Sequence, residues 1–127
     1  MDQEQFVYQP GVCNIDSAGV RWRRRLGYIT VAAGVVSIAA LFYLQFGPVF
    51  RFLICAGFTF AASVNFLQAK EHFCIANASM RTFEISLQRT KIADDLYKDL
   101  DLKKRRRLLL TSLIYAAIGG CLGLLPL

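Results

Sequence analysis

The sequence predicts an all-α integral membrane protein with three transmembrane helices and a helical hairpin that extends the second and third of them. Hydrophobic residues make up 55% of the 127 residues and the mean hydropathy is +0.40, which is too apolar for a soluble chain of this size. Long apolar runs occupy residues 26–46, 49–69 and 108–127, and the basic residues lie beside these runs. This arrangement is typical of helices that cross a bilayer.

Residues 1–25 form a polar segment ahead of the first span. Asp16 or Ser17 is expected to cap a helix that runs into the membrane, because both side chains can accept a hydrogen bond from the first helical turn. We expect no cleavable signal peptide before this helix, because the first residues are polar and acidic.

Residues 26–69 predict a transmembrane hairpin. The first run, 26–46, has 21 residues without a charge, and at about 1.5 Å per helical residue it extends over roughly 30 Å, the thickness of a hydrocarbon core. Gly47 and Pro48 leave room only for a tight turn, and Pro48 suits the first turn of the next helix, where its missing N–H costs nothing. The second run carries one charge, Arg51, near enough to its end to reach water.

Residues 70–107 are expected to form a helical stalk outside the lipid. Apolar side chains recur there at spacings of three and four, as on one face of a helix, at Phe73, Ala76, Met80, Phe83 and Leu87. The second helix should therefore continue past residue 70, reverse within residues 90–101 and return as a shorter helix. A strand through Phe83, Ile85 and Leu87 is the alternative, because these residues alternate with polar ones.

Residues 108–127 predict the third span, because they contain 20 residues without a charge. Three glycines near the end lower the helix propensity slightly, and a re-entrant segment is the alternative. With three spans, residues 1–25 and 70–107 lie on one side, which then holds 14 of the 15 lysines and arginines. The positive-inside rule makes that side cytoplasmic. We therefore expect a multi-pass protein of the cell membrane with its amino terminus in the cytoplasm and its carboxyl terminus outside.

Small residues four positions apart predict where the helices pack, because lipid offers no hydrophobic force to drive helices together and close approach must do so. Asn65 could add a hydrogen bond between helices. The rows could join helices within the chain, join copies of it in a homo-oligomer or bind a membrane-protein partner. The candidate positions are Ala33 with Ser37, Gly57 with Ala61, and Gly119 with Gly123, and a second row contains Ser112, Ala116 and Gly120.

Cys13, His72 and Cys74 form the candidate metal site. All three would lie just cytoplasmic of the membrane, and cysteine and histidine are the usual ligands of zinc and copper. The alternative is a histidine at the membrane interface with two buried thiols, because the spacing of His72 and Cys74 matches no ligand motif. No other cofactor is expected.

Two basic clusters are candidate sites for anionic lipid headgroups. Their alternative role is to orient the spans, which suffices to explain them. Basic residues that flank apolar runs also disfavour a nucleic-acid partner. The clusters consist of Arg21, Arg23, Arg24 and Arg25, and of Lys103, Lys104, Arg105, Arg106 and Arg107.

No catalytic set is evident in the sequence, which has one histidine and no glycine-rich phosphate loop. The absence of ionisable residues in the middle of the spans disfavours transporters and proton pumps. We therefore expect a non-enzymatic accessory or assembly subunit of a larger membrane complex. The alternatives are a thiol or metal site built from Cys13 and Cys74, and a hairpin that binds anionic lipid and shapes the membrane.

Short motifs stand out in roughly the first 75 residues: Gly11-Val12-Cys13-Asn14-Ile15, the arginine cluster with Gly27, Leu67-Gln68, and Phe73-Cys74. Together they resemble a set of small uncharacterised prokaryotic membrane proteins with three spans. The resemblance implies no activity. It favours a prokaryotic source and pairs Cys13 with Cys74, whereas His72 is not part of the shared pattern.

Overall fold

The computed structural model describes residues 6–92 and 96–126. Within them the chain forms a mainly helical fold with one small antiparallel sheet. In chain order the elements are α1 (Ser17–Tyr43), α2 (Pro48–Lys70), α3 (Ile75–Met80), β1 (Thr82–Ile85), β2 (Gln88–Lys91) and α4 (Leu96–Leu122).

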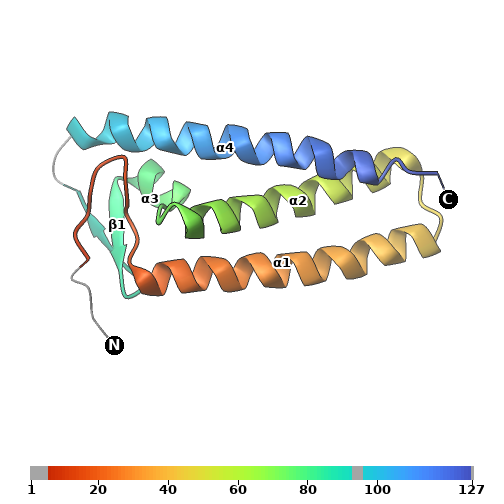
Figure 1. The fold of residues 1–127 in the computed structure, drawn as a ribbon, viewed down its shortest axis with the longest axis horizontal. Coiled ribbons are helices and arrows are strands. Elements are labelled where there is room, and N and C mark those ends of the chain that lie inside the picture. Colours follow the sequence, from red (N-terminus) through yellow and green to blue (C-terminus); the bar gives the residue numbers. More distant parts are fainter. Residues whose placement is uncertain (1–5, 93–95, 127) are drawn as a thin grey trace.

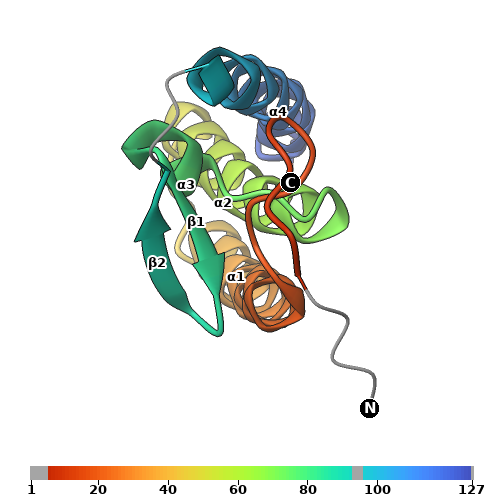
Figure 2. The same cartoon turned by 90° about the vertical axis from the view of Figure 1, so that its left-hand side faces the viewer.

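Helix α2 lies between α1 and α4 and runs antiparallel to both of them, so α1 and α4 run in the same direction (Figure 1). Helix α2 packs extensively on both neighbours, whereas few contacts join α1 to α4. The short elements α3, β1 and β2 and the segment before α1 gather at one end of the helices, where α1 and α4 begin and α2 ends (Figures 1 and 2). The opposite end carries the turn between α1 and α2 and the end of α4.

Helices α1 and α2 are each long and apolar enough to cross a membrane, which agrees with the predicted hairpin. Helix α4 runs without a break through the third apolar region, but its uncharged part begins only at Leu108 and ends at Leu122. At about 1.5 Å per residue that part is roughly 22 Å long, less than the roughly 30 Å of a hydrocarbon core. The third span therefore stays a prediction.

Both predicted helix starts are confirmed. The Asp16 carboxylate accepts a hydrogen bond from the backbone N–H of Gly19 at 3.0 Å, so Asp16 is the residue that caps α1. Gly47 precedes α2 and Pro48 is its first residue, where no intrahelical partner for an N–H is lost.

The predicted helical stalk over residues 70–107 is wrong in its first half, and the fold is accordingly not all-α. Helix α2 ends at Lys70, and His72 adopts a left-handed backbone conformation with φ of +52°. The helical spacing of the apolar residues did not predict this end, because Asn14, which precedes α1, bonds to His72 and to Cys74, whose backbone is extended. Within the first half the chain is helical again only in the short α3. It is helical again in the second half of this stretch, since α4 begins at Leu96 and continues into the third apolar run.

Strands β1 and β2 form a hairpin in which Ile85 pairs with Gln88. The two residues between them, Ser86 and Leu87, both have positive φ, of +50° and +64°. Positive φ at both central positions is the backbone that a two-residue hairpin requires, because it matches the twist of the strands. The alternative of a strand through Phe83 and Ile85 is therefore correct for β1, whereas Leu87 lies in the turn.

Buried residues recur every seven positions along the seam between α1 and α2, as in a left-handed pair of helices. Glycine stands opposite an aromatic ring twice, because Gly27 lies against Phe66 and Gly34 lies against Phe58. The residues of the seam are Val20, Gly27, Gly34 and Leu41 on α1 and Cys55, Ala62 and Ala69 on α2. The predicted row of Ala33 and Ser37 is not this seam, since Ala33 is exposed and Ser37 only half-buried.

Glycines of α4 form the second seam, as predicted for Gly119 and Gly123. A Cβ atom on Gly119 would overlap the side chain of Thr59, and one on Gly123 would lie 2.7 Å from the carbonyl oxygen of Arg51. Gly57 of α2 is exposed and faces open space, so it packs on neither neighbouring helix of this chain.

The other two positions of the predicted α2 row, Ala61 and Asn65, are half-buried. The side-chain amide of Asn65 donates to the carbonyl oxygen of Ala61 in its own helix at 2.9 Å. This bond takes the place of the predicted hydrogen bond to a neighbouring helix.

Replacing Gly119 with alanine is expected to lower the free energy of unfolding by about 1–3 kcal/mol, the usual cost of overpacking a tight contact. Gly57→Ala is the matched control, because it should cost nothing and should gain up to about 1 kcal/mol from the better helix propensity of alanine. Thermal unfolding of the purified variants in detergent micelles measures both effects. Equal stability of the two variants would contradict the α2–α4 seam.

Candidate functional site

The polar end of the molecule is held together by Asn14, which is fully buried. Its side-chain amide donates to the carbonyl oxygen of Cys74 at 3.1 Å and accepts from the backbone N–H of Cys74 at 2.6 Å. Its backbone N–H donates to the carbonyl oxygen of His72, and its own carbonyl oxygen accepts from the backbone N–H of Glu84. One residue therefore ties the segment before α1 to the chain after α2 and to β1. We call the assembly of residues 6–16, 71–92 and the first turns of α4 the polar cap.

A buried charge cluster lies beside Asn14. The guanidinium of Arg23 donates to the sulfur of Cys74 at 3.0 Å and to the carboxylate of Glu84 at 3.4 Å, and all three residues are buried. Burial alone would lower the pKa of the Arg23 guanidinium, but Cys74 and Glu84 outweigh burial and raise this pKa, so the group stays charged. Arg89 of β2 approaches the same carboxylate oxygen at 4.0 Å from the exposed side.

A second set of ionic contacts joins α4 to the chain after α2. The ammonium of Lys104 lies 3.4 Å from the carboxylate of Glu71 and donates to the carbonyl oxygen of Val12. Arg107 reaches the same carboxylate at 3.3 Å. Lys104 also lies over the ring of Phe73, 5.1 Å from its centre. These contacts make the base of α4 part of the polar cap.

The far side of the cap is anchored by Asp101 of α4, which is buried. Its carboxylate accepts from the hydroxyl of Tyr8 at 2.5 Å and from the backbone N–H of Gly11 at 2.7 Å. Gly11 has a φ of +67° and lies against Leu100, so a side chain at this position would be strained and crowded.

The structure places the three candidate metal ligands in different surroundings. Cys13 donates to the carbonyl oxygen of Val7 at 3.6 Å, His72 is exposed, and the sulfur of Cys74 accepts from Arg23. Over residues 6–92 and 96–126, no three His, Cys, Asp or Glu side chains are grouped as metal ligands are. The site stays a prediction. Bound metal that is present in the purified parent and absent from Cys13→Ser would support it, whereas a metal-free parent would contradict it.

The candidate headgroup residues divide into two groups. Arg23 and Lys104 differ from the prediction, because their charged groups bond inside the polar cap rather than pointing at a surface. Arg105 is half-buried and donates to the hydroxyl of Ser79 at 2.8 Å. The exposed members, which are open to an anionic surface, are Arg21, Arg24, Arg25, Lys103, Arg106 and Arg107.

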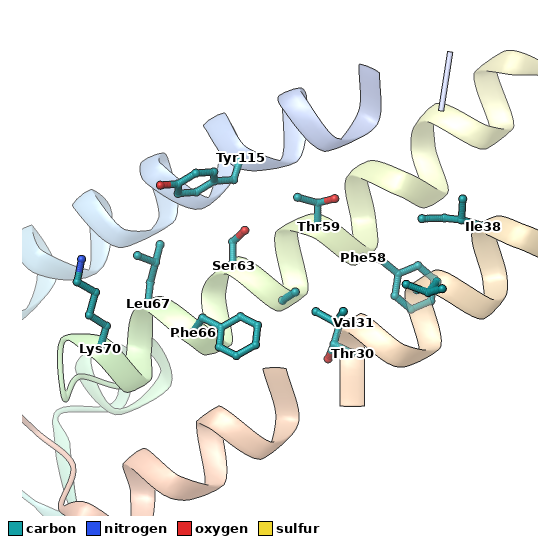
Figure 3. Close-up of a pocket in the computed structure, with 13 residues that line it drawn as sticks. Thr30, Val31, Ile38, Phe58, Thr59, Ser63, Phe66, Leu67, Lys70 and Tyr115 are labelled. Atoms are coloured by element: carbon teal, nitrogen blue, oxygen red, sulfur yellow. The ribbon is translucent and has the colours of Figure 1, made fainter. Parts of the chain in front are cut away.

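A groove of about 540 Å³ runs along α2, between α1 and α4 (Figure 3). Its walls include Val31, Val35 and Ile38 of α1 and Tyr115 of α4, and Lys70 lies at the end nearest the polar cap. We call this the lateral groove. Sequence reasoning missed it, because its shape depends on how far apart α1 and α4 lie. The only available signal was the single lysine that ends the second apolar run.

A second cavity of about 580 Å³ adjoins the buried charge cluster on the polar cap. Polar and apolar side chains from α1, α2 and the hairpin line it, among them Trp22, Asn65 and Leu87.

No protein-family model, curated protein or solved structure matches this chain.

The buried pair of Arg23 and Glu84 gives a stability prediction. Arg23→Met should lower the free energy of unfolding by about 3–5 kcal/mol, because it leaves a buried carboxylate with only a distant partner. The double variant Arg23→Met/Glu84→Met should lose less than the sum of the two single variants, because no unpaired charge stays buried. Arg24→Met is the control, because an exposed arginine on the same helix should cost no more than about 0.5 kcal/mol. Additive losses in chemical unfolding experiments would contradict the pairing.

Proposed function

We propose that this chain is a non-enzymatic integral membrane protein with three spans, α1, α2 and α4, and that it serves as an accessory or assembly subunit of a larger membrane complex. The observation that carries the proposal is the exposure of large apolar side chains along all three long helices. Examples are Val35 and Val36 on α1, Leu53 on α2 and Ile114 and Ile118 on α4. Such a surface is unfavourable in water and suits lipid or the apolar face of a partner.

The third span is supported by how α4 is joined to α2. The two helices are antiparallel and share the glycine seam, so the apolar part of α4 lies alongside that of α2. At the end away from the polar cap, Arg51 donates to the carbonyl oxygen of Leu125 and lies over the ring of Phe42. Because α4 packs on α2 over its apolar length, α4 enters the same hydrocarbon layer as α2. The uncharged residues after Leu122 lengthen the third span.

The orientation follows from the charges. The polar cap and the adjoining helix ends hold 14 of the 15 basic residues. The positive-inside rule puts this end in the cytoplasm and the turn at Gly47 outside.

A role as an accessory subunit is supported by the open arrangement of the helices. Helices α1 and α4 both pack on α2 and hardly on each other, so each keeps a broad apolar flank. Three spans alone cover little of one another, and helices in lipid associate through close packing of such flanks. Another membrane protein or a second copy of the chain can cover them.

Reporter domains fused to the two ends test the three-span topology. The amino-terminal reporter should be cytoplasmic and the carboxyl-terminal reporter should be outside, because an odd number of spans separates them. A chain that ends after residue 95, before α4, is the control, and its fused reporter should be cytoplasmic. Finding both ends of the full chain on one side would contradict the third span.

Gentle extraction of the native membrane tests the role as a subunit. The chain should migrate in mild detergent as a particle containing other polypeptides, well above the 14.3 kDa of one copy. Native electrophoresis followed by mass spectrometry identifies the components. A homo-oligomer would limit the proposal to self-association, and a single-copy particle would contradict it.

A further inference from the structure

The lateral groove has the form of a binding site for a long apolar chain. It is open along one side, and its floor is α2, with Ala62 buried at its base. Apolar side chains from α1 and α2 line most of it, and Lys70 is the one charged residue in its lining. The groove exists because α1 and α4 contact different side chains of α2 and hardly contact each other.

The dimensions of the groove favour a chain over a helix. From Lys70 to Phe58 the groove follows α2 for 12 residues, or about 18 Å at about 1.5 Å per residue. This length is close to the hydrocarbon depth of one leaflet, about half of the roughly 30 Å core. A helix of that length and about 10 Å across would occupy roughly 1,400 Å³, far more than the groove's volume of about 540 Å³.

The polar groups of the groove are placed for an acidic headgroup. Lys70 is the last residue of α2, is exposed, and lies at the end of the groove next to the polar cap (Figure 3). The hydroxyl of Tyr115 is directed toward the same end in Figure 3, and Ser63 lies farther along α2 from Lys70. A cation at the membrane surface with hydroxyl groups just below it complements a phosphate that heads an acyl chain.

We propose that the lateral groove binds one anionic phospholipid of the cytoplasmic leaflet, with its phosphate at Lys70 and one acyl chain along α2 between α1 and Tyr115. The site rests on the proposed membrane placement, because only then does Lys70 lie at headgroup level. It is separate from the exposed arginines of α1 and the lysines and arginines of α4, none of which lines the groove. The lipid covers the opening between α1 and α4 that the fold itself leaves bare.

Native mass spectrometry of the purified full chain tests the proposal. The chain is released from micelles doped with either phosphatidylglycerol or phosphatidylcholine, and the fraction carrying one lipid is measured. We expect more one-to-one complex with phosphatidylglycerol. Val35→Trp should remove this complex, because the indole fills the groove, whereas Val36→Trp is the matched control, because Val36 is exposed on the same helix outside the groove.

Charge variants give the second arm and do not depend on the folding of a tryptophan variant. Lys70→Gln should reduce binding of phosphatidylglycerol to the level of phosphatidylcholine, whereas Lys91→Gln, which removes an exposed charge on β2 outside the groove, should keep the difference. Equal binding by Val35→Trp and Val36→Trp would overturn the proposal and leave only annular lipid. So would equal effects of Lys70→Gln and Lys91→Gln. A groove that takes a partner helix would instead show lost co-purification in Val35→Trp with lipid binding unchanged.

A failure of the proposed lipid site can be distinguished from a failure of the proposed function. If the reporter fusions place both ends on one side while Lys70→Gln still abolishes the lipid preference, the groove stands and the three-span topology falls. If the topology holds and the groove variants bind lipid like the parent, only the lipid site falls.

Discussion

The fold depends on the four hydrogen bonds that Asn14 makes to Cys74, His72 and Glu84. Asn14 is fully buried, and in the protein interior an unpaired amide would cost more than a hydrogen bond returns. Because these bonds join the segment before α1 to the chain after α2 and to β1, they also fix where α2 stops and where β1 runs. The charge cluster of Arg23, Cys74 and Glu84 exists only because these three segments are already held together.

Helix α2 holds the long helices together along their length, as Asn14 holds together the segments of the polar cap. It presents large side chains to glycines of both neighbours, Phe58 and Phe66 to α1 and Phe52 to Gly120 of α4. Glycine at these positions lets the backbones approach closely, which is the main source of helix association in lipid. The same arrangement keeps α1 and α4 apart, and the lateral groove is the consequence. The stability of the fold and the presence of the groove thus have one cause.

The sequence alone determined the long helices and their ends where the signal is local. Asp16 and Pro48 start helices because of chemistry within their own first turns, and the apolar runs are long enough to identify α1 and α2 as candidate membrane helices. Gly119 and Gly123 were identifiable as packing residues on α4, because small residues four apart lie on one face. The sequence identified the candidate headgroup residues as basic, but it could not show which of them are exposed.

Tertiary structure decided everything that depends on distant partners. Helical spacing over residues 73–87 predicted a continued helix, but Asn14 bonds to Cys74 across 60 positions of the chain, and its hydrogen bonds outweigh the small preference of a helical stripe. Likewise, Arg23 looks like its exposed neighbours in sequence and is buried only because Glu84 lies opposite it in space. The choice of Gly27 and Gly34 over Ala33 and Ser37 depended on which side chains α2 turns toward α1. A local sequence pattern affects the free energy of a single helix turn. The end of α2, the burial of Arg23 and the residues of the seam depend instead on contacts that form only once the helices have packed together.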